Sequence, residues 1–215
     1  MSRSTTIPYI AELETLDNSS LYAELQRHGV AVNIDCNNWA AEYPYTPKVE
    51  ARMAYSQHGI AILFNITEEH TKAVELVDNG RVWEDSCVEF FVANPAAEGY
   101  FNFELNAIGT LLAAVRTSRE TANHFEAERL ATVRRYTSFE HSEIDICKSN
   151  SWYAVEVIPF ALLGLQSPPK NLRANLYKCG DKLQQPHFLS WSPITLDKPN
   201  FHCPEFFGTL IFNYE

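Results

Sequence analysis

Two glutamates interrupt apolar, strand-like segments and are the first candidates for chemistry. Glu89 lies within "VWEDSCVEFFV" (residues 82–92), and Glu104 lies within "YFNFELN" (residues 100–106). A carboxylate inside a buried strand needs a partner, because an unpaired buried charge destabilises the fold. The partner can be another side chain, a metal ion or a ligand. Two neighbouring carboxyl groups could also form a glycosidase pair.

Strand phase shows that these glutamates belong to a larger pattern. Alternate side chains of a strand point to opposite faces, and three segments divide in the same way. The side chains assigned to the core are Val88, Phe90, Val92, Phe101, Phe103, Leu105, Leu172, Ala174 and Leu176. The opposite face carries polar groups among aromatics, namely Glu89, Asn102, Glu104, Asn106, Arg173 and Asn175. Such a face is typical of a concave site for a small polar ligand, and sugars need this combination.

Further candidates lie next to this polar face. Trp83 precedes a strand and could form an exposed stacking platform, whereas Trp191 in "SWSPI" could be a second ring or a core residue. Arg173 could pair with Glu89 or Glu104 across the sheet, which is compatible with ligand binding. His202 could reach the cleft or play a structural role.

An acidic cluster near one strand start indicates a possible calcium site. Its members are Asp78, Glu84, Asp85 and Glu89. Calcium prefers oxygen ligands, but the spacing does not match a regular calcium-binding loop. Solvent exposure or capping remains the alternative for these carboxylates.

Short strands separated by turn signals dominate the rest of the chain. Period-2 patterns predict strands at 30–34, 47–56, 60–69, 87–92, 100–106, 110–115, 152–158, 172–177 and 206–212. Residues 17–29 predict a short helix, and residues 159–164 a single helical turn. The 20 residues from Glu120 look helical or irregular. The pattern predicts an all-β fold, an immunoglobulin-like or jelly-roll β-sandwich with a short N-terminal helix and minor helical insertions. We expect one domain over residues 1–215, with residues 1–16 as an N-terminal arm.

Composition limits the partners and the compartment. The 215 residues carry a formal net charge of −10, which argues against nucleic acid and anionic membranes as partners. The five cysteines are dispersed and odd in number, as expected for free thiols in a reducing compartment. No secretory signal is visible, so we expect a cytoplasmic location, and a secreted or periplasmic one only if the true N-terminus is missing. The sequence leaves the oligomeric state open.

The ordered segments resemble a known family. They are "VWEDSCVEFFV", "YFNFELNAIGT", "WYAVEVIPFALLG", "LRANLYKCGD", "FLSWSPI" and "FHCPEFFGTLIF". Together they resemble carbohydrate-binding module family 9-like domains, which are related to the DOMON-type β-sandwiches. The resemblance runs from about Trp39 to Phe212 and implies a sandwich that binds a saccharide.

The resemblance also implies roles for individual residues. Members of this family clamp a sugar end unit between two tryptophans, bond its hydroxyls with polar side chains, and carry structural calcium. Trp83 and Glu89 occupy the positions of the first stacking ring and its nearby carboxylate, and Trp191 is the candidate for the second ring. Asn102 or Glu104 lies where the family places a sugar-binding arginine, so that contact does not transfer.

Three functions follow as hypotheses. The leading one is non-catalytic binding of a mono- or oligosaccharide by Trp83, Glu89, Asn102, Glu104, Asn106, Arg173, Asn175 and Trp191. The second is a glycoside-active enzyme that uses Glu89 and Glu104. The third is a structural or interaction domain with a closed cleft.

Overall fold

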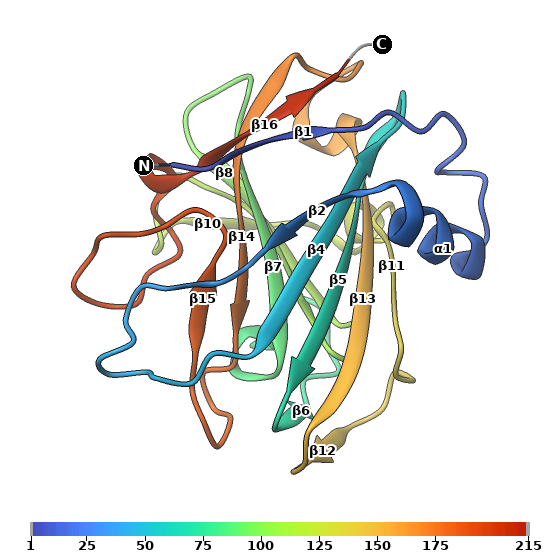
Figure 1. Ribbon diagram of the computed structural model, residues 1–215. Coiled ribbons are helices and arrows are strands. Elements are labelled where there is room, and N and C mark those ends of the chain that lie inside the picture. The colour runs from blue at the N-terminus through green and yellow to red at the C-terminus, as the bar shows by residue number, and fades with distance from the viewer. Residues whose placement is uncertain (1, 214–215) are drawn as a thin grey trace.

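The computed structural model, which describes residues 2–213, contains two β-sheets packed face to face (Figure 1). The larger sheet has the strand order β1-β16-β14-β7-β8-β9-β10, and β15 and β3 extend it beside β14. Its strands are β1 (Ser4–Ile7), β3 (Cys36–Asn37), β7 (Cys87–Ala93), β8 (Tyr100–Asn106), β9 (Leu111–Arg116), β10 (Ala122–His124), β14 (Asn171–Cys179), β15 (Phe188–Ser190) and β16 (Gly208–Phe212).

The smaller sheet has the order β11-β13-β5-β4-β2, and a two-stranded ribbon pairs β12 with β6. These strands are β2 (Val30–Asn33), β4 (Lys48–Tyr55), β5 (Gly59–Glu68), β6 (Thr71–Ala73), β11 (Arg134–Thr137), β12 (Ile144–Ile146) and β13 (Asn150–Pro159). The helical elements are α1 (Asn18–His28), α2 (Ala127–Leu130) and the single turns η1 (Val82–Glu84), η2 (Phe160–Leu163) and η3 (Pro204–Phe206). The β-sandwich prediction is confirmed.

The core between the sheets follows the predicted strand phase. Val88, Phe90, Phe101 and Phe103 from the larger sheet lie in the same apolar cluster as Ile62 from the smaller sheet. Burying large aliphatic and aromatic side chains contributes roughly 1.5–3 kcal/mol each. The two faces of each strand are therefore fixed by the alternation of apolar residues in the sequence.

A buried ion pair joins the two sheets inside this core. Lys178 of β14 places its Nζ atom 2.9 Å from the Glu68 carboxylate of β5, and neither side chain is exposed to solvent. The Trp152 indole donates to the same carboxylate at 2.7 Å. Loss of one partner would leave a buried charge uncompensated, which typically destabilises a protein by about 3–5 kcal/mol.

Helix α1 covers the outer face of the smaller sheet. The Asp17 side chain caps it by accepting a hydrogen bond from the Ser20 amide, and Leu21 and Leu25 are its buried residues. These leucines pack on Ala61 and Leu63 of β5. Strand β5 is consequently buried on both faces, as its nearly continuous apolar sequence predicts.

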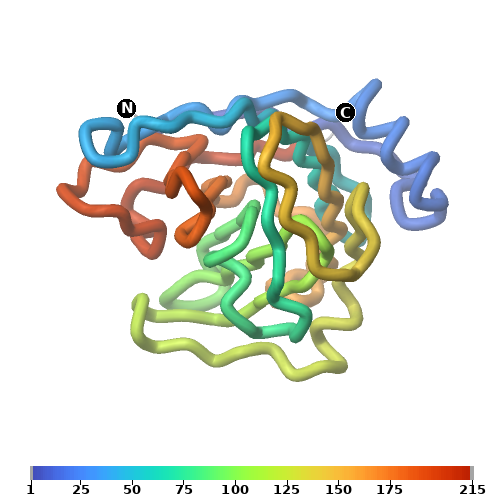
Figure 2. Tube along the Cα trace, turned by 90° about the horizontal axis from the view of Figure 1, so that it is seen from below, coloured from blue at the N-terminus to red at the C-terminus, as the bar shows by residue number. Residues whose placement is uncertain are grey.

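The outer face of the larger sheet is covered by two loop regions. Residues 34–47 and the C-terminal loops around residues 180–207 run side by side, as the light-blue and orange-red traces in Figure 2 show. Trp39, Ile194 and Phe201 from these loops pack on Phe91 and Tyr177 of the sheet. This face is therefore a second apolar interior, with polar side chains enclosed within it.

The segment after Glu120 differs in part from the sequence prediction. It forms β10, the single short helix α2 and β11, which pairs with the edge of β13. Short edge strands lack a strong period-2 signal, so β11 was missed. No helix in the described part of the chain is long and apolar enough to cross a membrane.

Candidate functional site

A pocket of about 290 Å³ opens on the covered face of the larger sheet. Strands β7, β8, β9 and β14 provide its floor, and the loops after β14 and β15 provide its walls. Its lining combines carboxyl, guanidinium, amide and aromatic groups from Trp83, Glu89, Glu104, Arg116, Arg119, Cys179, Asp181, Phe188, Pro199, Asn200, Phe201 and His202. A few directional polar groups among aromatic rings are typical of small-molecule sites.

Glu89 and Glu104 lie side by side on the pocket floor. The antiparallel register of β7 and β8 places them directly opposite each other, and each is 3% exposed. The Cys179 thiol donates a hydrogen bond to Glu89 Oε1 at 3.1 Å. The Asn102 amide donates to Glu104 Oε1 at 2.8 Å. Hydrogen bonds from Cys179 and Asn102 therefore fix the orientation of both carboxyl groups.

Burial changes the charge state of these two glutamates. Desolvation raises the pKa of Glu89 well above its usual range, and nearby Cys179 and Glu104 add to that effect. Desolvation raises the pKa of Glu104 to about 7, against the opposing effects of Asn102 and Arg116. Desolvation therefore favours the protonated form of Glu89, which can donate a hydrogen bond as well as accept one.

Arg116 is one of the two arginines that line the pocket, together with Arg119. Its Nε donates to Asn102 Oδ1 at 3.1 Å, and its Nη1 donates to the Arg119 carbonyl at 2.8 Å. Asn102 thus bridges Arg116 and Glu104 with one amide group. Arg116 lies on β9, which neighbours β8. The family resemblance implied an arginine at the position of Asn102 or Glu104 on β8.

The walls contain rings and a neutral histidine. Trp83 is half-buried, and its carbonyl accepts a hydrogen bond from the Asp181 amide at 3.1 Å. His202 Nδ1 lies 2.9 Å from the Tyr100 hydroxyl. Burial, together with Arg116 and Arg119, lowers the pKa of His202 to about 3. Desolvation raises the pKa of Asp181 to about 6, so its carboxyl remains largely ionised at neutral pH.

Asn106 and Asn175 were predicted as ligand contacts, but the structure gives them internal partners. Asn106 donates to the Glu75 carbonyl and to Asp85 Oδ2, and its own oxygen accepts from the Thr110 amide. Asn175 exchanges two hydrogen bonds with the backbone of Ser192. Both amides stabilise loops, and neither lines the pocket.

The hypothesis that Arg173 pairs with Glu89 or Glu104 is wrong. Arg173 is exposed, and its Nη2 donates to the carbonyls of Glu205 and Phe207. The register places Tyr177 opposite Glu89, and Arg173 is four residues further along β14, roughly 13 Å away. Strand phase identified the face of Arg173 correctly but not its position along the strand.

Trp191 does not line the pocket and lies in the core between the two sheets. It is 2% exposed, and its amide donates to the Leu176 carbonyl at 2.8 Å. Leu176 faces the core, so a residue that continues the β15 register opposite it also faces the core. Phe188 and Phe201 are instead the rings that line the pocket together with Trp83.

The four acidic residues of the possible calcium site do not converge. Asp78 pairs with Arg135, Glu84 with Lys182, and Asp85 accepts from the backbone amides of Val74 and Glu75. Among the described residues, no group of three metal-ligating side chains includes Asp78, Glu84 or Asp85. Each carboxylate is satisfied by protein groups in its own location.

Several pocket residues were not identified from the sequence. Arg116 could have been found by extending the predicted strand at 110–115 by one residue, because Arg116 then shares a face with Leu112 and Ala114. Arg119, Asp181, Phe188, Asn200 and Phe201 come from loops or short strands, where periodicity carries no information about direction. Their assignment requires the tertiary structure.

A β-sandwich with a polar and aromatic pocket on one covered sheet has the architecture of a small-ligand binding module. The model of the carbohydrate-binding family 9 matches residues 21–212. The chain therefore belongs to this family. The search of curated proteins returned no match.

Solved structures agree with this assignment. A presumed carbohydrate-binding protein from Bacteroides uniformis is 37% identical, with a TM-score of 0.92 over 99% of this chain and 100% of that one. A family 9 carbohydrate-binding module from Caldicellulosiruptor kristjanssonii in complex with glucose is 8% identical, with a TM-score of 0.62 over 98% of this chain and 96% of that one. A structure of a family 9 module from the same organism in complex with cellotriose is also 8% identical, with a TM-score of 0.60 over 98% of this chain and 93% of that one. The last two likenesses show the shared fold.

Proposed function

We propose that the pocket above Glu89 and Glu104 binds a mono- or oligosaccharide without chemical change. The observation that carries this proposal is the lining itself, in which donors and acceptors surround a floor of paired carboxyl groups and three aromatic rings stand among them. Family membership supports the same ligand class, as do the glucose and cellotriose complexes of the two Caldicellulosiruptor structures.

The size of the pocket favours one sugar unit. A volume of about 290 Å³ lies at the lower end of the range for small-molecule pockets, about 300–1,000 Å³. A hexose presents hydroxyls around its edge and C–H groups on its faces. Glu89, Glu104 and Arg116 can bond the hydroxyls, while Trp83 can stack on a face. An open pocket beside Trp83 argues against the closed-cleft hypothesis.

Calorimetric titration with glycan-array hits tests the proposal. We expect Trp83→Ala and Glu104→Gln each to weaken binding about tenfold or more, because each loses roughly 1.4 kcal/mol or more of stacking or hydrogen bonding. Tyr9→Ala removes an exposed ring outside the pocket and serves as the matched control. If the pocket variants bind like the control, or if wild type binds no saccharide, the proposal is wrong.

A second experiment separates saccharide binding from glycoside cleavage. Two adjacent carboxyl groups are also what a glycosidase uses, one protonated as the acid and the other ionised as the base or nucleophile. Mass analysis of the saccharide after prolonged incubation decides between the two functions. Recovery of intact ligand supports binding, whereas shortened products that disappear in Glu104→Gln support the enzyme.

A further inference from the structure

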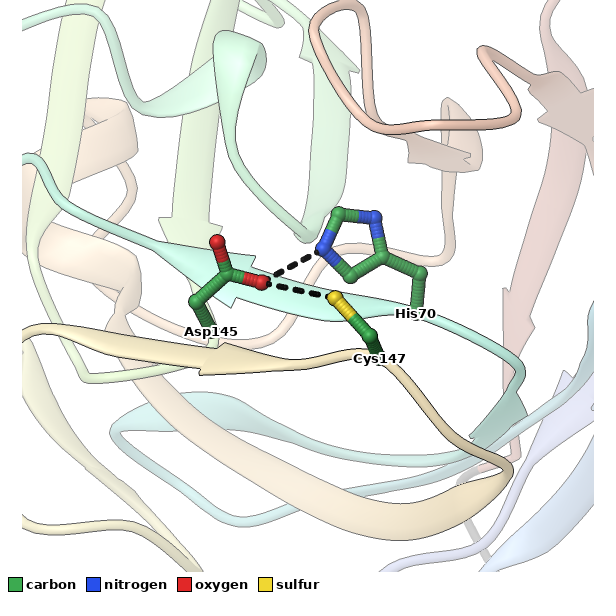
Figure 3. Close-up of side chains that lie close together, drawn as sticks. All are labelled: His70, Asp145 and Cys147. Atoms are coloured by element: carbon green, nitrogen blue, oxygen red, sulfur yellow. Dashed lines mark hydrogen bonds and ion pairs between the residues drawn. The ribbon is translucent and has the colours of Figure 1, made fainter.

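A second group of chemically active side chains lies on the ribbon of β6 and β12. The register pairs Lys72 with Asp145 and Thr71 with Ile146. Asp145 and Cys147 are two residues apart and share one face, and His70 precedes β6 opposite Cys147. Figure 3 shows the three side chains His70, Asp145 and Cys147 pointing toward one another.

The three donor atoms already lie at the spacing of a metal site. One nitrogen, one oxygen and one sulfur are all within 4.8 Å of one another. Asp145 Oδ1 lies 2.8 Å from His70 Nε2 and 3.2 Å from Cys147 Sγ. Two protons therefore point at the same carboxylate oxygen, and a single cation could replace both of them.

We propose that His70, Asp145 and Cys147 form a binding site for a divalent transition-metal ion of the zinc type. Imidazole, thiolate and carboxylate are the ligands that zinc takes, and three protein ligands leave a fourth tetrahedral position for water. The Asp145 side chain is 56% exposed and that of His70 is 8% exposed, so the ion has access from solvent on one side and a fixed imidazole on the other. A thiolate ligand selects against calcium and magnesium.

Binding requires a defined movement of protons. The backbone N–H of Gln184 donates to His70 Nδ1 at 3.1 Å, so in the free protein the imidazole proton is on Nε2 and points to Asp145. The Gln184 side-chain amide donates to Cys147 Sγ at 3.3 Å. Metal coordination by Nε2 moves the imidazole proton to Nδ1, so the loop that carries the Gln184 backbone N–H must shift away from His70. The Cys147 thiol releases its proton to solvent.

The surrounding charges also affect the affinity. Lys72 lies opposite Asp145 in the register, so its ammonium group carries a positive charge next to the proposed cation site. The Glu69 carboxylate accepts a hydrogen bond from the Gln185 side-chain amide at 2.8 Å. Gln185 is next in the chain to Gln184, which contacts His70. Removal of the Lys72 charge should strengthen zinc binding, because a cation site gains from the loss of a neighbouring ammonium group.

The test is titration of the chelator-stripped protein with zinc chloride, without saccharide, followed by calorimetry and by the thiolate absorption of a cobalt-substituted sample. We expect one zinc per chain, binding at least about tenfold weaker in Cys147→Ser and His70→Gln, and stronger binding in Lys72→Met. The matched controls are Cys36→Ser and His28→Ala, which alter a thiol and an exposed histidine elsewhere.

Two results would overturn the site: wild type takes up no stoichiometric zinc, or Cys147→Ser binds zinc as tightly as Cys36→Ser. Cys147 is exposed, so its replacement by serine leaves the packing of the sandwich intact even if a His70 variant unfolds. The titration contains no sugar, and its outcome is independent of the saccharide proposal.

Discussion

At the scale of single residues, Glu156 is the most unusual group in the core. Both of its carboxyl oxygens are buried without a hydrogen-bond partner among the described residues. It lies on β13 opposite Arg135. The Arg135 guanidinium donates hydrogen bonds to the carbonyls of Gly109 and Leu130 and to the Asp78 carboxylate. Desolvation raises the pKa of Glu156 to about 8, so this side chain is neutral at physiological pH.

Glu156 makes the stability of the protein depend on pH. In the unfolded chain its carboxyl group ionises near pH 4.5, whereas in the folded chain it keeps its proton to about pH 8. The folded state binds the extra proton in this window, so the free energy of unfolding falls as pH rises through it. Replacement of Glu156 by glutamine, which cannot ionise, removes this pH dependence of the free energy of unfolding.

We expect Glu156→Gln to become more stable relative to wild type between pH 4.5 and 8, by on the order of 4 kcal/mol. Urea denaturation at a series of pH values measures the difference. The buried His187 and His202, whose pKa values are lowered to about 3, titrate in both proteins and cancel. Parallel pH profiles for the two proteins would contradict the prediction.

Residue chemistry on the polar face was only partly predictable from the sequence. Trp83, Glu89 and Glu104 were chosen by strand phase and resemblance, and the structure places all three in the pocket. The same reasoning also predicts ligand contacts for Asn102, Asn106, Arg173, Asn175 and Trp191, and none of these five lines the pocket. Asn102 lies beneath the floor, where it bonds Glu104 and Arg116. Phase fixes the face of a side chain, but only register fixes its neighbours, and register depends on pairing between distant segments.

At the scale of elements, the turn between β7 and β8 packs against the end of β9 that carries Arg116. Gly99 has a φ of 101°, and a Cβ atom there would lie 2.3 Å from the Arg116 carbonyl oxygen. Arg116 is one of the two arginines that line the pocket. A side chain at position 99 would therefore strain the turn and also displace the backbone of β9.

We expect Gly99→Ala to lower both the free energy of unfolding and saccharide affinity. The matched control is Gly164→Ala, because Gly164 also has a positive φ of 74° but has nothing within 4 Å of an added Cβ atom. Both variants lose roughly 1–2 kcal/mol to the left-handed backbone, and Gly99→Ala loses more. Urea denaturation and calorimetry provide the comparison, and equal losses in the two variants would refute the steric argument.

Elements with strong periodicity were predicted well. The boundaries of β8 and the hairpin of β4 and β5 match the sequence prediction closely. β4 and β8 alternate apolar and polar residues over most of their length, whereas β5 is a nearly continuous apolar segment that begins at a turn. β3, β6, β12 and β15 have two or three residues each and leave no such signal. The ribbon that carries the proposed zinc site is made of two of these short strands, so it could not be predicted.

At the scale of the whole molecule, the first and last described strands are neighbours. β1 runs parallel to β16, whereas the other paired strands of the described sheets are antiparallel. Figure 1 shows the two strands side by side along the top of the sandwich. β1 has four residues and lies at the edge of the sheet, and of these Ile7 alone is buried.

We expect amide hydrogens of β1 that are bonded to β16 to exchange roughly tenfold or more faster than those of the central strands β7 and β8, through local opening. A short edge strand with one buried side chain can detach while the core stays packed. Hydrogen–deuterium exchange with mass spectrometry measures the rates. Equal protection of β1 and β7 would show that β1 belongs to the cooperative core.

The pairing of β1 with β16 also determines when the larger sheet can be completed during synthesis of the chain. β1 is translated about 200 residues before its partner strand β16, so this pair cannot form until the rest of the described sandwich has been translated. The contact has a very large sequence separation and adds to the contact order of the fold, which slows folding. During that interval the unpaired strand is exposed to chaperones and to other nascent chains.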